Sequence, residues 1–303
     1  MMKKKVALVT GATGFIGSRL VIRLEQEGWE VHVIVRESSK LNELIDVRKK
    51  IQIHTYNGQI ETLIEIVKAA SPDIVFHIAS LFIARHKSEE ISALIDSNLK
   101  FPTQLLEAMT INNVKNFINT GTSWEYYESD EYNPVCLYAA TKHAFESIIE
   151  YYVQVHELRC ITLKLFDTYG VSDPRKKIIS LLARVSESRE CFAMSPGEQE
   201  IDLVYIDDVV DMYLLVAIEI VKMEPQQKYY DVTSGNSITL KELVTRFENA
   251  LGKELSIKWG ALPYRDREVM RSVRKMNVFP GWKPKITLDD GLKTVIDFFP
   301  GEQ

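Results

Sequence analysis

Several features that would narrow the class of protein are scarce or missing in this sequence of 303 residues. The three cysteines, Cys136, Cys160 and Cys191, are too few and too scattered for a disulfide framework or a metal site. No apolar run approaches the roughly 18 residues of a membrane span, and the Met-Met-Lys start lacks the apolar segment of a signal peptide. We therefore expect no metal, no membrane association and a cytoplasmic location.

The charged residues likewise show no excess that would favour a polyanionic partner. The chain has 37 Lys and Arg against 42 Asp and Glu, a formal net charge of −5, with both signs interspersed. This balance gives no reason to expect a nucleic-acid partner. With 46% hydrophobic residues, and neither a repeat nor a low-complexity segment, the chain can bury the core of one or two domains.

Short apolar runs alternate with segments of helical periodicity over the first 166 residues. The runs are "KVALVT", "EVHVIV", "IQIHTY", "DIVFHIA", "KNFINT" and "CITLKLF", and the helical segments between them are 17–27, 60–70, 91–109 and 138–155. Strands without polar alternation are buried on both faces, which is typical of a parallel sheet covered by helices. The pattern predicts an α/β protein with a doubly wound Rossmann sheet.

After residue 166 the pattern becomes turn-rich, as in "YGVSDPRKK", "AMSPGEQE" and "KMEPQQK". A further strand runs into an apolar helix in "IDLVYIDDVVDMYLLVAIEI". We predict a dinucleotide-binding Rossmann domain at 1–166 and 202–233. A smaller C-terminal α/β domain at 167–201 and 234–303 is expected to bind substrate.

The first strand ends in a glycine-rich turn, "VTGATGFIGSRL", with glycines at positions 11, 14 and 17. Gly11 permits a tight turn, Gly14 removes the side chain that would face a pyrophosphate, and Gly17 lets the helix pack on the strand. The helix N-terminus that follows offers free N–H groups to a phosphate. A glycine triplet alone is weak, and an ordinary strand–helix turn remains the alternative. Its position after a strand and before a helix favours a dinucleotide site.

The second strand ends "VIVRESSK", where an acidic residue would bind a ribose 2′-hydroxyl and select NAD. Here Arg36 stands at that point, followed by Ser38 and Lys40, and these residues suit a 2′-phosphate. We therefore favour NADP(H) as cofactor, with NAD(H) possible, and the alternative is that Arg36 is only a solvated strand end.

Tyr138 and Lys142 lie four residues apart in "LYAATKHAFESIIEYY", on one face of a predicted helix. An adjacent ammonium stabilises a phenolate and lowers the pKa of the phenol, so that Tyr138 could exchange a proton with a carbonyl or carbinol oxygen. Alone this spacing is common and fits a surface pair. Together with the glycine loop it indicates a dehydrogenase-type site.

With these motifs in order, the sequence resembles the extended short-chain dehydrogenase/reductases that act on nucleotide sugars. The resemblance covers nearly the whole chain and is carried by "TGATGFIGSRL", "PDIVFHIAS", "DSNLKFPTQLLEA", "LYAATK", "LKLFDTYG", "GEQEIDLVYIDDVV" and "GWKPKITLDDGL". It implies a nicotinamide cofactor, a nucleotide-sugar substrate and the catalytic residues Tyr138 and Lys142. The implied cofactor-binding residues are Gly11, Thr13, Gly14, Phe15, Ile16, Gly17, Arg36, Ser38, Gln59, Ile60, Ala79, Ser80, Asn98, Tyr138, Lys142 and Leu165.

The family also places a Ser or Thr four residues before a Tyr, where it hydrogen-bonds the reacting oxygen. In "FINTGTSWEYYES" both Thr122 and Ser123 meet this spacing, and we slightly prefer Thr122. Members that eliminate water carry Thr-Asp-Glu at this point. Neither register offers the Asp-Glu pair here, which is evidence against a 4,6-dehydratase.

Three functions remain after this exclusion. Arg36 favours NAD(P)H-dependent reduction of a 4-keto (deoxy)sugar nucleotide, similar to the 4-ketoreductases that complete deoxysugar nucleotides. The alternative is an NAD-dependent 4-epimerase, which keeps its cofactor bound and usually has an acidic residue in place of Arg36. A non-catalytic dinucleotide-binding regulator ranks lower, because such members typically lose the Tyr or the Lys.

At the substrate end, the resemblance implies contacts from Leu81, His86, Trp124, Asp167, Arg175 and Arg265. Some positions depart from the family pattern: Asp167 replaces an Asn near the diphosphate, and Ile201 replaces an Arg. A carboxylate at position 167 would repel a diphosphate unless it points elsewhere or pairs with a cation.

The family pairs two helices, here 91–109 and 138–155, across a two-fold axis as a four-helix bundle. This implies a homodimer. The stripe of Ile148, Tyr151, Tyr152 and Val155 fits such an interface, and it equally fits ordinary core packing.

Overall fold

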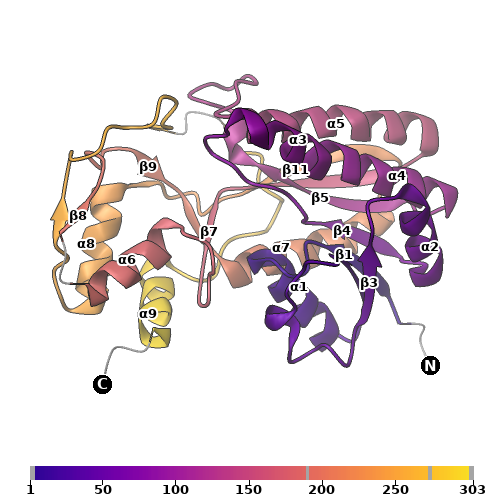
Figure 1. The fold of residues 1–303 in the computed structure, drawn as a ribbon, viewed down its shortest axis with the longest axis horizontal. Coiled ribbons are helices and arrows are strands. Elements are labelled where there is room, and N and C mark those ends of the chain that lie inside the picture. Colours follow the sequence, from indigo (N-terminus) through magenta and orange to yellow (C-terminus); the bar gives the residue numbers. More distant parts are fainter. Residues whose placement is uncertain (1–3, 189–190, 272–274, 300–303) are drawn as a thin grey trace. The chain divides into compact units, whose positions relative to one another are not determined.

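The computed structural model describes residues 4–188, 191–271 and 275–299, which form two compact units (Figure 1). The first unit consists of Met1–Glu125, Cys136–Lys164 and Val210–Tyr230, and the second of Tyr126–Val135, Leu165–Val209 and Asp231–Gln303. Among the described residues, no helix is both long enough and apolar enough to cross a membrane.

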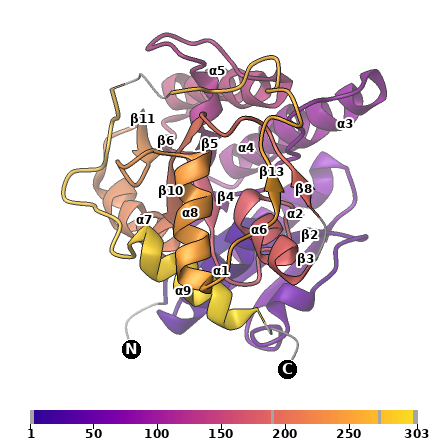
Figure 2. The ribbon, with the colours of Figure 1, turned by 90° about the vertical axis from the view of Figure 1, so that its left-hand side faces the viewer.

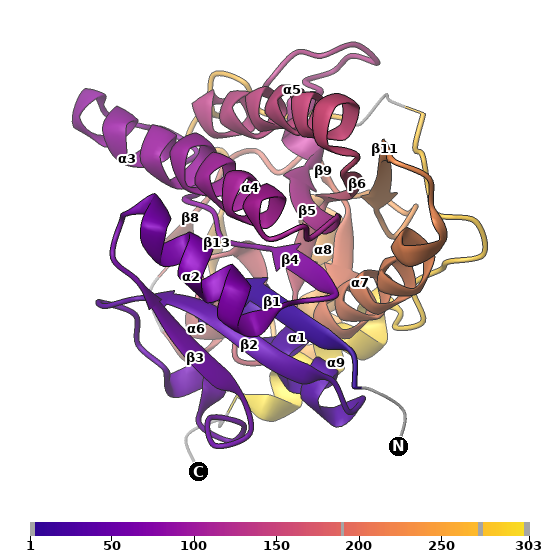
Figure 3. The same cartoon turned by 90° about the vertical axis from the view of Figure 1, so that its right-hand side faces the viewer.

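The first unit is built on a seven-stranded sheet with the strand order β11-β6-β5-β4-β1-β2-β3 (Figure 3). The strands are β1 (Val6–Thr10), β2 (Glu30–Arg36), β3 (Gln52–Tyr56), β4 (Ile74–His77), β5 (Asn116–Thr122), β6 (Arg159–Leu165) and β11 (Gln226–Val232). β1 lies parallel to both β2 and β4, and the pairs β2–β3 and β4–β5 are also parallel. The strand order reverses between β1 and β4, so the predicted doubly wound Rossmann fold is confirmed.

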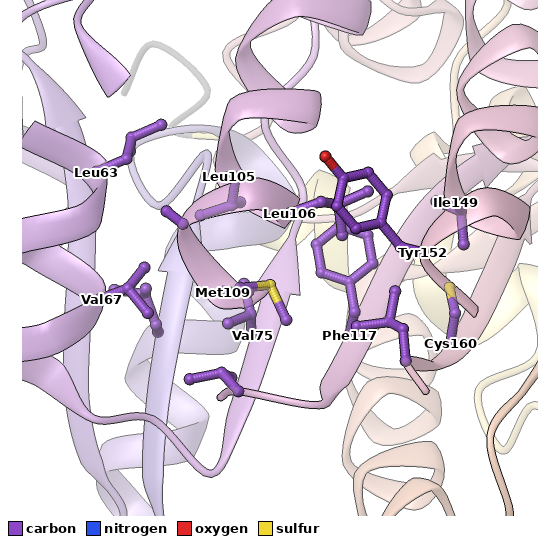
Figure 4. Packing of buried hydrophobic residues seen from close by; sticks show 14 of the residues in the cluster. Leu63, Val67, Val75, Leu105, Leu106, Met109, Phe117, Ile149, Tyr152 and Cys160 are labelled. Carbon is purple, nitrogen blue, oxygen red and sulfur yellow. The ribbon is translucent and has the colours of Figure 1, made fainter. Parts of the chain in front are cut away.

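Helices cover both faces of this sheet. On one face α2 (Ile60–Ala70), α4 (Phe101–Ile111) and α5 (Leu137–His156) bury one apolar cluster against β1, β4 and β5 (Figure 4). α1 (Phe15–Gln26) and the residues of α7 (Ile206–Glu219) that belong to this unit lie on the opposite face (Figure 3). Burial on both faces explains why the strands read as continuous apolar runs.

The predicted helix 91–109 is interrupted by a π-helical turn. The structure has α3 (Ile91–Ile95), a π segment at Asp96–Lys100, and then α4. The π turn carries the buried Asn98, whose side chain is fully engaged with two other segments of the unit. Single π turns inside α-helices occur frequently at functional sites.

The second unit contains three helices and three short strand pairs among its described residues (Figure 2). The helices are α6 (Ile178–Glu187), α8 (Leu240–Leu251) and α9 (Leu288–Phe298). The paired strands are β7 (Asp167–Tyr169) with β10 (Leu203–Tyr205), β9 (Glu200–Ile201) with β12 (Ile238–Thr239), and β8 (Phe192–Ala193) with β13 (Ile257–Lys258). The hydroxyls of Thr239 and Thr287 cap α8 and α9 by accepting backbone N–H bonds.

The compact units differ from the predicted domain boundaries at two segments. Residues 126–135 belong to the second unit, because Asn133 accepts a hydrogen bond from Arg267 and Glu128 accepts one from the backbone N–H of Met270. Residues 202–209 join the same unit through the pairing of β10 with β7. Which unit binds substrate stays a prediction.

Candidate active site

The loop between β1 and α1 has the conformation that its glycines predict. Gly11 has a φ of +69°, and a Cβ there would lie 2.5 Å from the backbone nitrogen of Ala79, so no other residue fits. A Cβ on Gly17 would lie 2.1 Å from the carbonyl oxygen of Gly11, because the helix packs directly on the loop. The chain itself therefore requires both of these glycines.

Gly14 is different, and it provides a test of whether the loop fits a dinucleotide. A Cβ there would meet only the carbonyl oxygen of Gly11, at 3.3 Å, and the residue is exposed. Packing within the protein therefore gives little reason for a glycine at the N-cap of α1. A phosphate approaching the helix N-terminus would give that reason, so the loop fits the cofactor that the sequence predicts.

The loop after β4 is held beside this glycine loop. The hydroxyl of Thr10 accepts backbone N–H bonds from Ile78 and Ala79, each at 3.2 Å, and lies 2.9 Å from Nδ1 of His77. His77 is buried, and burial followed by the charge of Lys142 holds its pKa well below the ordinary value. His77 is thus a neutral core residue that helps to join the two loops.

Asn98 fixes the next part of the same loop. Its side-chain oxygen accepts from the backbone N–H of Leu81 at 2.8 Å and from the hydroxyl of Ser80 at 3.1 Å. Its amide nitrogen donates to the carbonyl of Leu81 and to the hydroxyl of Thr141, both at 3.0 Å. The π turn at Asp96–Lys100 therefore connects the loop after β4 to Thr141 on α5, the residue before Lys142.

The predicted catalytic residues of the first unit come together at the end of β5. Tyr138 is 8% exposed, and the hydroxyls of Ser80 and Thr122 act on its phenol and lower the pKa of that phenol. Thr122 ends β5, and its hydroxyl also accepts the backbone N–H of Trp124 at 3.3 Å. Ser123 begins the 3-10 turn that follows and is half-buried, with no hydrogen bond to Tyr138 among the described residues. The geometry therefore favours Thr122 of the two candidate hydroxyls.

The electrostatics of the pair differ from the sequence-based expectation. Burial raises the pKa of Tyr138 above its ordinary value and outweighs the two hydrogen bonds that lower it. Burial also lowers the pKa of Lys142 to about 8, against the charges of Glu125 and Glu146, which raise it. The expectation that Lys142 acidifies Tyr138 is not met in this structure, because desolvation is the larger effect. Tyr138 is therefore a protonated phenol here.

An aromatic side chain that the sequence reasoning missed lies against the catalytic tyrosine. The ring of Phe82 is 44% exposed, and its centroid lies 5.0 Å from that of Tyr138 and 5.4 Å from that of Trp124, in edge-on contacts. The predicted substrate residue Trp124 thus belongs to an aromatic wall beside Tyr138. The one signal in the sequence was that Phe82 lies in the loop after the fourth strand, and ligands of such sheets bind at the carboxyl ends of the strands.

A buried charged cluster behind this wall was also missed. The ammonium of Lys164 on β6 donates to Oε2 of Glu125 at 2.8 Å and lies 3.2 Å from Oε2 of Glu146. Nδ1 of His143 lies 3.2 Å from the same oxygen of Glu125. Glu125, His143 and Glu146 could together ligate a metal, with their ligand atoms within 4.8 Å of one another. The ammonium of Lys164 already supplies the positive charge at this position.

The other residues predicted to bind the cofactor lie on loops, at a strand end or in the first turns of α1 and α2 in the first unit, apart from Leu165, which begins a segment of the second. Arg36 and Ser38 are exposed in the turn after β2, where the backbone N–H of Arg36 donates to the hydroxyl of Ser39 at 3.0 Å. Gln59 is exposed at the N-cap of α2. Of the remainder, Phe15 is buried, whereas Thr13, Ile16, Ile60, Ala79 and Leu165 are half-buried. Their contact with a cofactor stays a prediction.

The predicted substrate residues divide between the two units. In the first unit, Leu81 is half-buried and His86 is exposed, both in the segment after β4. In the second, Asp167 pairs with Lys177 at 3.1 Å, which supplies the cation that a carboxylate there needs. Arg175 forms a two-point ion pair with Asp173 at 2.8 Å, and Nε of Arg265 donates to Glu268 at 2.8 Å.

A second arginine of the last segment was not predicted. Arg267 lies with its guanidinium 4.2 Å from the ring centroid of Tyr127, and it donates to the side chain of Asn133. Its Nε is buried without a hydrogen-bond partner among the described residues. In sequence it was the second arginine of "PYRDREVM", and the family resemblance pointed only to Arg265.

The fold is a Rossmann-like fold of the kind found in dinucleotide-binding enzymes, and comparisons with known proteins agree with it. A model of the NAD dependent epimerase/dehydratase family matches residues 7–230, and the chain belongs to this family. The prediction that the protein is an enzyme of the extended short-chain dehydrogenase/reductases is thereby confirmed.

Two relatives match over almost their full length. CDP-abequose synthase of Salmonella muenchen is 31% identical, and that of Salmonella typhimurium is 28% identical, each over 97% of this chain and 98% of the relative. The crystal structure of UDP-glucose 4-epimerase from Thermotoga maritima with UDP-glucose covers 97% of this chain and 98% of its own, with a TM-score of 0.83 and 24% identity. This structural likeness supports the fold.

Proposed function

We propose that the protein reduces the 4-keto group of a nucleotide-linked deoxysugar with NADPH, using Tyr138, Lys142 and Thr122 as catalytic residues. The observation that carries the proposal is that Thr122 and Tyr138 are both buried and that the Thr122 hydroxyl acts on the phenol, which burial keeps protonated. A protonated phenol next to a hydroxyl donor is suited to giving a proton to a carbonyl oxygen.

Each residue of this group has a distinct role in the proposed reaction. Reduced nicotinamide, when bound, supplies the hydride that converts the ketone carbon to a carbinol. Thr122 hydrogen-bonds the carbonyl oxygen and orients it, and Tyr138 gives that oxygen its proton as the C–O double bond becomes single. Lys142 stabilises the phenolate left on Tyr138 until solvent returns the proton. The reaction is balanced by one hydride and one proton for each ketone reduced.

Two features support reduction over 4-epimerisation. CDP-abequose synthases, which carry out a reductase step, are 28% and 31% identical over 97% of this chain, against 24% for the UDP-glucose 4-epimerase of Thermotoga maritima over the same share. Arg36 and Ser38 are exposed in the turn after β2, where they can meet a ribose 2′-phosphate. A reductase that draws on NADPH needs such a contact, whereas an epimerase that retains NAD does not.

We propose that the cofactor lies along the carboxyl ends of β1, β2 and β4. Its pyrophosphate would meet the N–H groups from Thr13 to Gly17, and its adenine would lie near Gln59 and Ile60. Asn98 contributes indirectly, because its side chain is already used to hold Leu81 and Thr141. Ala79, Ser80 and Leu165 complete the proposed cofactor site.

We propose a CDP-linked sugar as the first substrate to test, because the relatives matched over their full length are CDP-abequose synthases. Leu81, His86 and Trp124 of the first unit are the proposed contacts with the sugar. Arg175 and Arg265 of the second unit are proposed to bind the diphosphate, with Asp167 neutralised by Lys177.

We also propose a homodimer through α3 and α5. Ile91 and Ile95 on α3 are 42% and 38% exposed, and Tyr151 and Val155 on α5 are each 55% exposed, which is unusual for four large apolar residues. Tyr152 of the same stripe is instead buried in the core, where it donates to Glu107. Sedimentation of the wild type and of Tyr151→Glu tests this, and a monomeric wild type would contradict it.

The activity is tested by following NADPH absorbance with CDP-, UDP- and dTDP-linked 4-keto-6-deoxy sugars. We expect NADPH to be consumed with the CDP sugar and Tyr138→Phe to lower kcat by about a hundredfold or more at unchanged melting temperature. Interconversion of two sugar nucleotides without loss of NADPH, with NAD retained through purification, would instead identify an epimerase.

A further inference from the structure

An exposed aromatic ring lies directly against the catalytic tyrosine of the first unit. Phe82 is 44% exposed, and its ring contacts that of Tyr138 edge-on, with the centroids 5.0 Å apart and the planes at 79°. It also contacts Trp124, with the centroids 5.4 Å apart and the planes at 61°. Single exposed apolar side chains are ordinary on a protein surface, but this one adjoins the residue that we propose as proton donor. A ligand that reaches the phenol on this side therefore meets apolar carbon.

The backbone just before Phe82 is held firmly. Leu81 uses both of its backbone groups in hydrogen bonds to the side chain of Asn98: its N–H donates at 2.8 Å, and its carbonyl accepts at 3.0 Å. Asn98 is 2% exposed, and its amide also donates to the hydroxyl of Thr141 on α5, the helix that carries Tyr138. The loop of Phe82 is thus tied to the helix of the catalytic tyrosine. Such support is what a side chain needs if it is to discriminate between ligands.

The chemistry beside the phenol follows from this arrangement. A ketone that takes a proton from Tyr138 has its oxygen within hydrogen-bond reach of the phenol. The two carbons that flank the ketone, and the groups on them, then lie close to the same side chain. Against the Phe82 ring, a CH₂ or CH₃ group gains by leaving water. A hydroxyl group would lose its water there without a new partner, because the ring has no hydrogen-bonding atom.

We propose that Phe82 is a specificity-determining residue that selects sugars deoxygenated beside the ketone. In a 4-keto sugar these are sugars with hydrogen instead of hydroxyl at C3, or with methyl instead of hydroxymethyl on C5. This inference rests on the proposed function, because it takes Tyr138 as the group that faces the ketone. It adds the residue that recognises the missing oxygen.

Three sugar nucleotides that need no turnover test this selection: CDP-glucose, CDP-6-deoxyglucose and CDP-3-deoxyglucose. Each deoxy compound differs from CDP-glucose by one oxygen atom. Isothermal titration calorimetry on the protein saturated with NADP⁺ gives the Kd of each. We expect at least one deoxy compound to bind about 10- to 100-fold more tightly than CDP-glucose, since an apolar contact rejects an added hydroxyl by about this factor. The compound that gains affinity shows whether the ring lies against C3 or against the group on C5.

Substitutions at position 82 assign the preference to the ring. Phe82→Gln offers a hydroxyl a hydrogen-bond partner, so the preference should fall below about threefold. Phe82→Leu keeps the surface apolar and should stay within about threefold of the wild-type preference. The matched control is Ile111→Ser, which changes a 55% exposed apolar residue at the end of α4 and should leave the preference unchanged. If Phe82→Gln does not fold, Phe82→Ala, which admits water beside the hydroxyl, takes its place with the same expectation.

Equal affinity of the wild type for all three compounds, or a preference that persists in Phe82→Gln, would overturn the inference. Both results come from binding alone. A wild type that prefers a deoxy compound but consumes no NADPH with any 4-keto sugar nucleotide would contradict the proposed function, while the selection by Phe82 would stand on the affinities.

Discussion

The lysine–carboxylate pair of the first unit and the ion pairs near the predicted substrate residues of the second unit differ in how far they are buried. In the first, Lys164 and Glu125 are 1% and 0% exposed, and each is bonded to a partner from a distant part of the sequence. In the second, Lys177 and Asp167 are 31% and 33% exposed, and Arg175 and Arg265 pair with carboxylates two and three residues away. Buried charges act strongly on their neighbours, whereas half-exposed local pairs are worth little and are easily exchanged for a ligand. The first arrangement suits proton chemistry, and the second suits the capture of a diphosphate.

The largest expected effect is on stability, and it tests the contrast directly. Lys164→Met leaves Glu125 and Glu146 without their shared counter-ion, and we expect the free energy of unfolding to fall by about 3–5 kcal/mol. The matched variant Lys177→Met breaks an exposed pair of similar length and should cost less than about 1 kcal/mol. Urea denaturation at pH 7 measures both. Equal losses in the free energy of unfolding would mean that burial does not change how much an ion pair contributes to stability.

A second prediction concerns the pH dependence of stability. Burial, and then the charge of Glu125, raise the pKa of Glu146 in the folded protein from 4.5 to about 7. The folded protein therefore holds this proton more tightly than the unfolded chain. The stability that it contributes is fully present below pH 4.5 and is lost as the pH rises through about 7.

Glu146→Gln should remove this loss. We expect the unfolding free energy of wild type, relative to that of the variant, to fall by about 2 kcal/mol between pH 4.5 and pH 7.5. Glu150→Gln, an exposed position one turn along α5, should show a difference that is nearly independent of pH. A wild type that gains stability relative to Glu146→Gln over this range would contradict a raised pKa of Glu146 in the folded protein.

The exposed charge after β2 should affect binding and leave stability unchanged. We expect Arg36→Ala to raise KM for NADPH about tenfold, with KM for NADH within about twofold of wild type, because only NADPH carries the 2′-phosphate. Steady-state kinetics with both cofactors measure this, with Arg48→Ala, an exposed arginine further along the chain, as the control. A wild type that prefers NADH would contradict the proposed cofactor.

The smallest effect is expected in the second unit. Arg265→Ala should raise KM for the nucleotide sugar by about three- to tenfold and leave kcat and the melting temperature close to wild type, because its pair with Glu268 is local and half-exposed. Lys176→Ala serves as control for an exposed cation of the same unit. A fall in kcat at unchanged KM would assign Arg265 to the reaction instead of to binding.

The same contrast explains what the sequence could predict. The Rossmann sheet followed from apolar runs and a glycine turn, and the nearness of Tyr138 and Lys142 followed from helical spacing, because both are local patterns. Thr122 was slightly preferred over Ser123, although both meet the spacing, and the action of its hydroxyl on Tyr138 agrees with that preference. Residues whose surroundings are formed by their neighbours in sequence could therefore be predicted from the sequence.

Glu125 and Phe82 could not be predicted in this way, because their surroundings depend on segments far away in sequence. One local sign existed: Lys164 interrupts the apolar run "CITLKLF", and a lysine in a buried strand requires a counter-ion. Nothing local indicated which acid would supply it. The raised pKa of Tyr138 was missed for the same reason, since burial depends on the whole fold.

The central claim, that Tyr138 and a nicotinamide cofactor together reduce a sugar ketone, is tested most directly by isotope transfer. NADPH deuterated at the transferable position of nicotinamide C4 is incubated with a CDP-4-keto-6-deoxy sugar, and the product is analysed by NMR. We predict one deuterium at sugar C4 for each NADPH consumed and, with Tyr138→Phe, almost no labelled product. Conversion of one sugar nucleotide into another without deuterium at C4 would contradict the account.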